Sequence, residues 1–104
     1  MSKTDNKAAK IGVPLNSIRV FVEAARLLSF SRAALALEMT QSGVSHHVSS
    51  LEGYLGQALF IRSGSSVNLT DAGRLYFDTV QEAVSTIELS TRQLKQGPEG
   101  SGRL

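Results

Sequence analysis

Both histidines of the chain stand side by side in the segment TQSGVSHHVSSLE, residues 40–52, among serines and one glycine. Such residues can coordinate a metal, hydrogen-bond within a flexible loop, or face an outside partner from the surface of a helix. Neighbouring residues on a helix diverge by about 100°. The chain has no cysteine, and no further histidine completes a ligand set around His46 and His47. Metal binding is therefore the weakest of the three interpretations.

The same residues do not favour catalysis. The chain has no thiolate nucleophile and no glycine-rich phosphate loop, and His46 has no carboxylate partner in helical register. A chain of 104 residues also offers too little core to enclose a substrate pocket. We expect a protein that is not an enzyme and that uses no cofactor and no metal.

The composition indicates one small globular domain with tails, since 41% of the 104 residues are hydrophobic and 19% are charged. No apolar run of about 18 residues is present, and the basic start lacks the apolar core of a secretory signal. We expect a cytoplasmic protein without a membrane partner. Much of the net charge of +2 comes from Lys3, Lys7 and Lys10, so charge alone is a weak indication of nucleic-acid binding.

Three short segments show apolar residues at helical spacing, and they predict helices over residues 15–28, 30–37 and 41–55. Ser29 and Thr40 are the expected N-caps of the second and third helices. Alanines in the second helix let another helix approach closely. The expected buried positions are Leu15, Ile18, Phe21, Val22, Ala25 and Leu28 in the first helix and Val44, Val48, Leu51 and Leu55 in the third.

The remainder predicts a hairpin and one long helix. Residues 59–62 and 67–69 are strand candidates around the turn SGSS, and Thr70 and Asp71 favour the start of a helix that runs to about residue 96. Apolar residues then recur at alternating steps of three and four, as in a coiled coil. This predicts a dimer seam, with packing of the helix on its own domain as the alternative. The seam positions are Phe77, Val80, Val84, Ile87, Thr91 and Leu94.

Two short helices joined by a tight turn, followed by a hairpin, predict a mainly α winged helix-turn-helix fold. In order and spacing, the chain resembles the DNA-binding region of LysR-type transcriptional regulators over about residues 15–94. The blocks that carry the resemblance are FVEAARLLSFSRAALAL (21–37), TQSGVSHHVSSLE (40–52), LGQALFIR (55–62) and LTDAGR (69–74). The runs PLNSIRVF and AARLLSFSRAA look more like the branch that contains activators of glycine cleavage and of β-lactamase.

The resemblance implies an organisation and a function. Residues 1–13 would be a mobile arm, 14–69 the DNA-binding domain, 70–96 the dimerisation helix and 97–104 a hinge toward an absent effector domain. The chain would be part of a longer regulator or a short natural repressor. Its partners would be double-stranded DNA at a pseudo-palindromic operator and a second copy, with a tetramer in the full-length protein. A small-molecule effector would act only through the absent domain.

The third helix would read the DNA bases. Ser42, His46 and Ser49 lie opposite its buried face, with Gln41 and Ser45 at the flank. By resemblance, all of these except Ser49 occupy the base-reading positions of the family. Two of them depart from the family pattern, because Ser42 stands where proline is frequent and His46 where arginine is frequent. The contact expected from His46 is therefore weaker and depends on protonation of the imidazole.

The next residue, His47, leans toward the core stripe, so partial packing and DNA contact are both open. Gly43 would allow close approach of a neighbouring helix or of DNA.

Other residues would hold the DNA backbone. Ser31 and Arg32, at the start of the second helix, suit a phosphate, with ordinary capping and a surface charge as the alternative. Arg62 could reach a narrow minor groove from the wing over residues 62–67. Ser63, Ser65 and Ser66 are lesser phosphate candidates. The alternative function is a winged-helix module that binds or dimerises with proteins and does not bind DNA.

Overall fold

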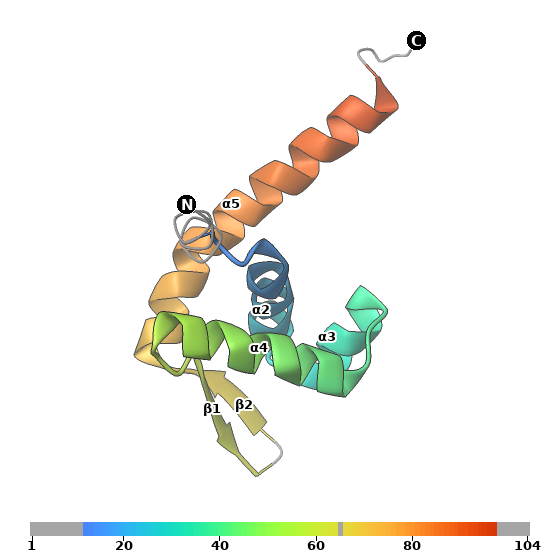
Figure 1. Ribbon diagram of the computed structural model, residues 1–104. Coiled ribbons are helices and arrows are strands. Elements are labelled where there is room, and N and C mark those ends of the chain that lie inside the picture. Colours follow the sequence, from blue (N-terminus) through green and yellow to red (C-terminus); the bar gives the residue numbers. More distant parts are fainter. Residues whose placement is uncertain (1–11, 65, 98–104) are drawn as a thin grey trace, which may run out of the picture.

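The computed structural model describes residues 12–64 and 66–97. In chain order its elements are α2 (Leu15–Leu27), α3 (Phe30–Leu37), α4 (Gln41–Leu55), β1 (Phe60–Ser63), β2 (Ser66–Leu69) and α5 (Asp71–Gln96). Figure 1 shows α2, α3 and α4 gathered into one body, with the hairpin on one side of it and α5 projecting away. The mainly helical winged fold is therefore confirmed. The predicted arm and hinge lie almost wholly outside the described residues.

Within the described part of the chain, no helix has the length and apolar character needed to cross a bilayer.

The helix starts follow from local side-chain chemistry. Ser29 accepts a hydrogen bond from the backbone N–H of Arg32 at 3.1 Å, and Thr40 accepts one from Gly43 at 3.0 Å. Thr70 does the same for Gly73 at 2.9 Å. Each hydroxyl satisfies an amide that has no partner inside the helix. The predicted caps at Ser29 and Thr40, and the helix start at Thr70, are thus confirmed.

The core lies where α4 crosses α2 and the base of the hairpin. Phe21 of α2 is fully buried and sits 5.6 Å, between ring centroids, from both Phe60 and Tyr76. Val44, Val48 and Leu51 of α4 are fully buried as predicted. The largest fully buried side chains of the domain are Phe21, Leu51, Leu59, Val44 and Val48.

Of the positions predicted to be buried, Leu15 and Leu28 are exposed and Leu55 is only half-buried. Leu15 is 61% exposed because it is the first residue of α2, where no other element of the described part of the chain covers it. Leu28 is 44% exposed because it lies past the end of α2, with a left-handed φ of 51° that turns its side chain out of the helical stripe. Leu55 is half-buried at the last position of α4.

The hairpin begins one residue later than predicted. Glu52 accepts hydrogen bonds from the backbone N–H of Leu59 at 2.8 Å and of Phe60 at 3.3 Å. The Leu59 amide is therefore occupied by a carboxylate from α4 instead of a strand partner. The antiparallel pairing then runs from Phe60 opposite Leu69 to Ser63 opposite Ser66.

The first turn of α5 is fastened to the base of the hairpin. Thr70 donates through its hydroxyl to the carbonyl of Ala58 at 2.7 Å and through its N–H to the carbonyl of Leu59 at 3.0 Å. At Gly73 an added Cβ would lie 2.1 Å from the same Leu59 carbonyl oxygen. Only glycine allows α5 to cross the hairpin base this closely.

Candidate nucleic-acid interface

One face of α4 is polar and free of the core. Gln41, Ser42, His46 and Ser49 are exposed, and Ser45 is half-buried. This matches the side of the helix predicted from the valine and leucine spacing. Three of these five residues are serines with short side chains, so a duplex could approach the helix closely here. Their contacts with bases stay a prediction.

The two histidines have different surroundings. His46 is exposed, whereas His47 is half-buried and its Nδ1 is hydrogen-bonded to Ser17 Oγ of α2 at 2.9 Å. Ser17 is only 8% exposed. The structure therefore favours packing for His47. Ser17 was missed in the sequence, although it stands one turn before Phe21 on the buried face of α2, a spacing that could have found it.

Nothing in the described ranges 12–64 and 66–97 gathers three or more His, Cys, Asp or Glu side chains around a potential metal ion.

Gly43 serves the N-terminus of its own helix. A Cβ there would lie 3.1 Å from Thr40 Oγ1 and 3.3 Å from Met39 Cε. The close neighbours are thus the N-cap Thr40 and Met39, the residue before it. They, and not another helix, favour a small residue at this position.

The start of α3 presents two of the predicted backbone contacts. Ser31 and Arg32 are exposed. The Arg32 N–H is already bonded to Ser29 Oγ, and Ser31 Oγ lies 3.2 Å from the same hydroxyl. The amide that could have held a phosphate is therefore used in capping, and the two side chains remain available.

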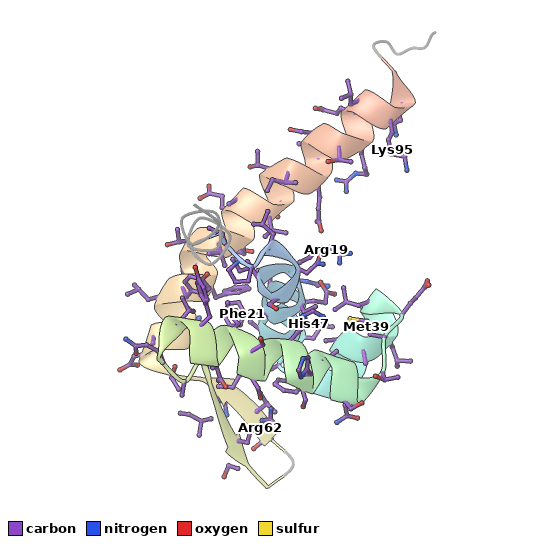
Figure 2. The ribbon with its side chains drawn as sticks, in the orientation of Figure 1. Arg19, Phe21, Met39, His47, Arg62 and Lys95 are labelled. Carbon is purple, nitrogen blue, oxygen red and sulfur yellow. The ribbon has the colours of Figure 1, made fainter. Side chains whose placement is uncertain are left out.

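Arg62 extends from β1 back toward the start of α3. Its guanidinium carbon lies 4.4 Å from the ring centroid of Phe30, within cation–π distance. Figure 2 labels Arg62 between the hairpin and α4. The sequence did not identify Phe30 as part of the interface, because a phenylalanine in an apolar stripe predicts core. In the wing, Ser63 is exposed and its carbonyl accepts a hydrogen bond from Ser66 Oγ at 3.0 Å, while Ser65 lies outside the described residues.

A cleft of about 400 Å³ joins these elements. Its polar lining brings together Ser31 of α3, Gln41 of α4 and Arg62 of β1, which are far apart in sequence. The full lining is Leu28, Ser29, Phe30, Ser31, Gln41, Arg62, Gly64 and Val67. A concave polar surface beside a helix of small side chains fits the backbone and edge of a nucleic acid.

The charged side chains of this region differ in their partners. Two arginines and two glutamates lie in residues 29–69. The carboxylate of Glu52 is occupied by the amides of Leu59 and Phe60 on the hairpin side. Arg32 and Arg62 remain exposed near the starts of α3 and α4. In the described part of the chain neither arginine forms an ion pair. Both guanidinium groups can therefore meet an anionic partner.

The predicted dimer seam divides into two parts. Phe77, Val80 and Val84 are half-buried and pack against the core of their own domain. Ile87 is 54% and Leu94 is 83% exposed, while Thr91 is exposed and donates to the carbonyl of Ile87 at 2.7 Å. The apolar residues beyond Val84 are therefore exposed, although Glu88 Oε2 still lies 3.6 Å from Arg19 Nε of α2.

An apolar groove of about 420 Å³ lies between the end of α4 and the first half of α5. Tyr76 lines it, and the pKa of this phenol is raised above its ordinary value by burial first and by Tyr54 second. Leu75 on its rim is 72% exposed.

Comparisons with known proteins agree on one family. A model described as bacterial regulatory helix-turn-helix protein, lysR family, matches residues 15–74. Over 82 residues the chain is 49% identical to the glycine cleavage system transcriptional activator of Escherichia coli (strain K12), covering 79% of this chain and 27% of that protein. Over 69 residues it is 48% identical to the HTH-type transcriptional activator AmpR of Rhodobacter capsulatus, covering 66% and 24% respectively.

The crystal structure of the BenM_DBD/catB site 1 DNA complex matches with a TM-score of 0.72 at 26% identity, covering 85% of this chain and 95% of that chain. This chain spans about a quarter of the length of the two curated relatives, both of which are transcriptional activators and not enzymes.

Proposed function

The chain belongs to the lysR family of bacterial regulatory helix-turn-helix proteins, and on that premise we propose that it is the sequence-specific DNA-binding part of a transcription regulator. Residues 14–69 form the DNA-binding unit, and residues 70–96 form the dimerisation helix. Such a regulator binds the chromosome and therefore works in the cytoplasm. The relatives place it among regulators and not among enzymes.

The exposed polar face of α4, next to the cleft that contains Arg62, is the observation that carries this function. Gln41 can pair with both edge groups of adenine, and Ser42 and Ser45 can donate to or accept from bases. His46 and Ser49 extend the same face toward bases or phosphates. Ser31, Arg32 and Ser63 supply backbone contacts beside it.

The operator is pseudo-palindromic because two copies bind it together. The exposed apolar residues Ile87 and Leu94 need a partner surface, and a second copy offers the same helix. The dimer places one α4 in each of two major grooves on one face of the duplex. Tetramer formation and control by a small molecule would depend on the part of the full-length relatives that this chain does not span.

The test begins with selection of bound sites from random duplexes, which yields the operator, and continues with fluorescence titration of operator and scrambled duplex. Gln41→Ala and Ser45→Ala are expected to reduce the specificity ratio, since one good base contact contributes about 1–3 kcal/mol of discrimination. Gln81→Ala and Ser90→Ala are the matched controls, because both residues are exposed on α5 and away from α4.

Two results would contradict the proposal at different levels. Full retention of the specificity ratio in both α4 variants would show that α4 is not the reader. A wild-type chain without salt-dependent affinity for any duplex would remove DNA binding altogether.

A further inference from the structure

We propose that Phe30 is a positioning residue for DNA binding. Its ring holds the guanidinium of Arg62 at the cleft, so that Arg62 contacts a backbone phosphate next to the base read by Gln41 and does not reach into the minor groove. The inference rests on the proposed function and adds a residue that the helix-turn-helix pattern does not identify.

The Phe30 ring, which lies against the guanidinium of Arg62, is held rigidly by the core. Phe30 is only 5% exposed, and its ring meets that of Phe60 at 5.2 Å and 80°, an edge-to-face arrangement. Phe60 also meets Phe21 of the core, with ring centroids 5.6 Å apart. The ring under the guanidinium is therefore fixed by the core, which also anchors β1.

The stack sets the direction of Arg62. The residue pairs with Val67 in the middle of the hairpin, and its guanidinium carbon lies 4.4 Å from the Phe30 centroid. The side chain therefore runs from the strand toward the start of α3. To extend past the hairpin tip at Gly64, it would have to leave the ring and lose the cation–π contact.

The guanidinium keeps its hydrogen-bonding capacity in this position. Within residues 12–64 and 66–97, Arg62 forms neither an ion pair nor a hydrogen bond with another side chain. A cation–π contact occupies the face of the guanidinium and leaves its N–H groups free in the plane. Two parallel N–H groups match a phosphate in a bidentate geometry.

The surroundings place that phosphate beside the base contact. Arg62 lines the same cleft as Gln41 and Ser31. A duplex seated on α4 would pass a backbone segment over this cleft, where Ser31 can donate a further hydrogen bond.

Ordering of the Arg62 side chain by Phe30 before DNA binds should increase the affinity. Immobilising a long side chain on association costs about 0.5–1.5 kcal/mol. The stack removes part of that cost, because the side chain is already ordered. Phe30 should thus affect affinity without changing the number of phosphate contacts, whereas Arg62 should affect both.

The experiment measures Kd for the selected operator at several salt concentrations, using the full chain and its Phe30→Leu, Arg62→Gln and double variants. Arg62→Gln is expected to weaken binding about tenfold and to reduce the salt slope by about one. Phe30→Leu is expected to weaken binding about three- to fivefold with an unchanged slope. In the Arg62→Gln background, Phe30→Leu should have no further effect on Kd.

Additional variants keep the test decisive. Arg62→Lys retains the charge and loses the planar guanidinium, so it should weaken binding severalfold with an unchanged slope even if Phe30→Leu fails to fold. Arg92→Gln, an exposed arginine near the end of α5, is the charge-matched control and should leave the slope unchanged. The loss caused by Arg62→Gln should also be equal for operators with A·T or G·C flanks.

The possible results distinguish the role of Phe30 from DNA binding itself. Equal losses from Phe30→Leu in both backgrounds would mean that Phe30 has only a structural role. A loss from Arg62→Gln confined to A·T flanks would mean that Arg62 reads the minor groove. Either outcome overturns the inference while DNA binding stands, whereas a wild-type chain that binds no duplex overturns the proposed function itself.

Discussion

At the residue scale, the contrast between His46 and His47 shows what a helical pattern can predict. The spacing of valines and leucines placed His46 on the outer face, and that is where it lies. For His47 the same pattern left packing and contact open, because the residue stands at the border of the two faces. The Ser17 hydroxyl decides the question, and its partner lies 30 positions away in sequence.

The hydrogen bond between Ser17 and His47 yields a stability prediction. Ser17→Ala leaves the half-buried His47 Nδ1 without its partner, so the free energy of unfolding should fall by about 1 kcal/mol. Urea denaturation followed by circular dichroism measures the change. Ser90→Ala, at an exposed position of α5, is the control and should stay close to wild type. An unchanged midpoint for Ser17→Ala would indicate that water replaces the hydroxyl.

Tyr76 yields a pH prediction. Burial, and secondarily Tyr54, raise the pKa of its phenol in the folded state above the ordinary value of about 10. The folded state therefore binds this proton more tightly than the unfolded state does. The stability linked to Tyr76 is fully present below the unfolded pKa and is lost as pH rises through the folded pKa.

Urea midpoints of wild type and Tyr76→Phe at successively more alkaline pH test this linkage. The wild type should lose stability more steeply than Tyr76→Phe. Parallel curves for the two proteins would rule out a contribution from this phenol.

At the element scale, local chemistry made the helices predictable. Ser29 and Thr40 have short oxygen-bearing side chains directly before apolar periodic runs, and each caps its helix. The start of β1 was not predictable in this way. It depends on the Glu52 carboxylate that α4 brings to the Leu59 amide, which is a tertiary contact.

Gly73 gives a prediction about how the elements join. Gly73→Ala places a Cβ 2.1 Å from the Leu59 carbonyl oxygen, so α5 must shift away from the hairpin, and we expect a loss of stability of about 3 kcal/mol or more. Gly53→Ala on α4 is the matched control. Among the described residues nothing lies within 4 Å of a Cβ added at Gly53, so this variant should gain about 0.5–1 kcal/mol.

Thermal or urea unfolding distinguishes the two glycine variants. Similar stability changes for both would mean that helix propensity, and not the contact with Leu59, determines the effect at position 73.

At the scale of the whole molecule, the two halves of α5 have different surroundings. Heptad spacing predicted one continuous seam, because a sequence pattern cannot tell which apolar face covers another. In the structure the half that includes Phe77 and Val80 packs on its own domain. The rest of α5 projects from it beyond the ion pair of Glu88 with Arg19. Packing on the domain is thus the correct interpretation for the first half of the helix, and the dimer seam stays a prediction for the exposed second half.

This division identifies the variants that test the dimer. Ile87→Asp and Leu94→Asp should convert a dimer to a monomer with little change in the stability of the domain, because both side chains are exposed. Val84→Asp should also destabilise the domain, since Val84 packs against the core. Sedimentation equilibrium gives the mass, and Arg92→Gln is the control. An unchanged dimer mass in the double variant Ile87→Asp and Leu94→Asp would place the dimer contact elsewhere.

The fastening of α5 at Thr70 has a mechanical consequence. The helix contains no proline, and its single glycine lies in the first turn, so we expect it to be straight and stiff. It can therefore transmit a rotation along its length of about 39 Å. The hydrogen bonds of Thr70 to the carbonyls of Ala58 and Leu59 attach the start of this helix to the base of the hairpin. A rotation imposed near Gln96 would therefore reach the base of the hairpin, where the packing of Phe77, Val80 and Val84 on the core couples it to the whole domain. The domain would then turn as one body, so that Arg62 and Gln41 keep their spacing while the orientation of both changes.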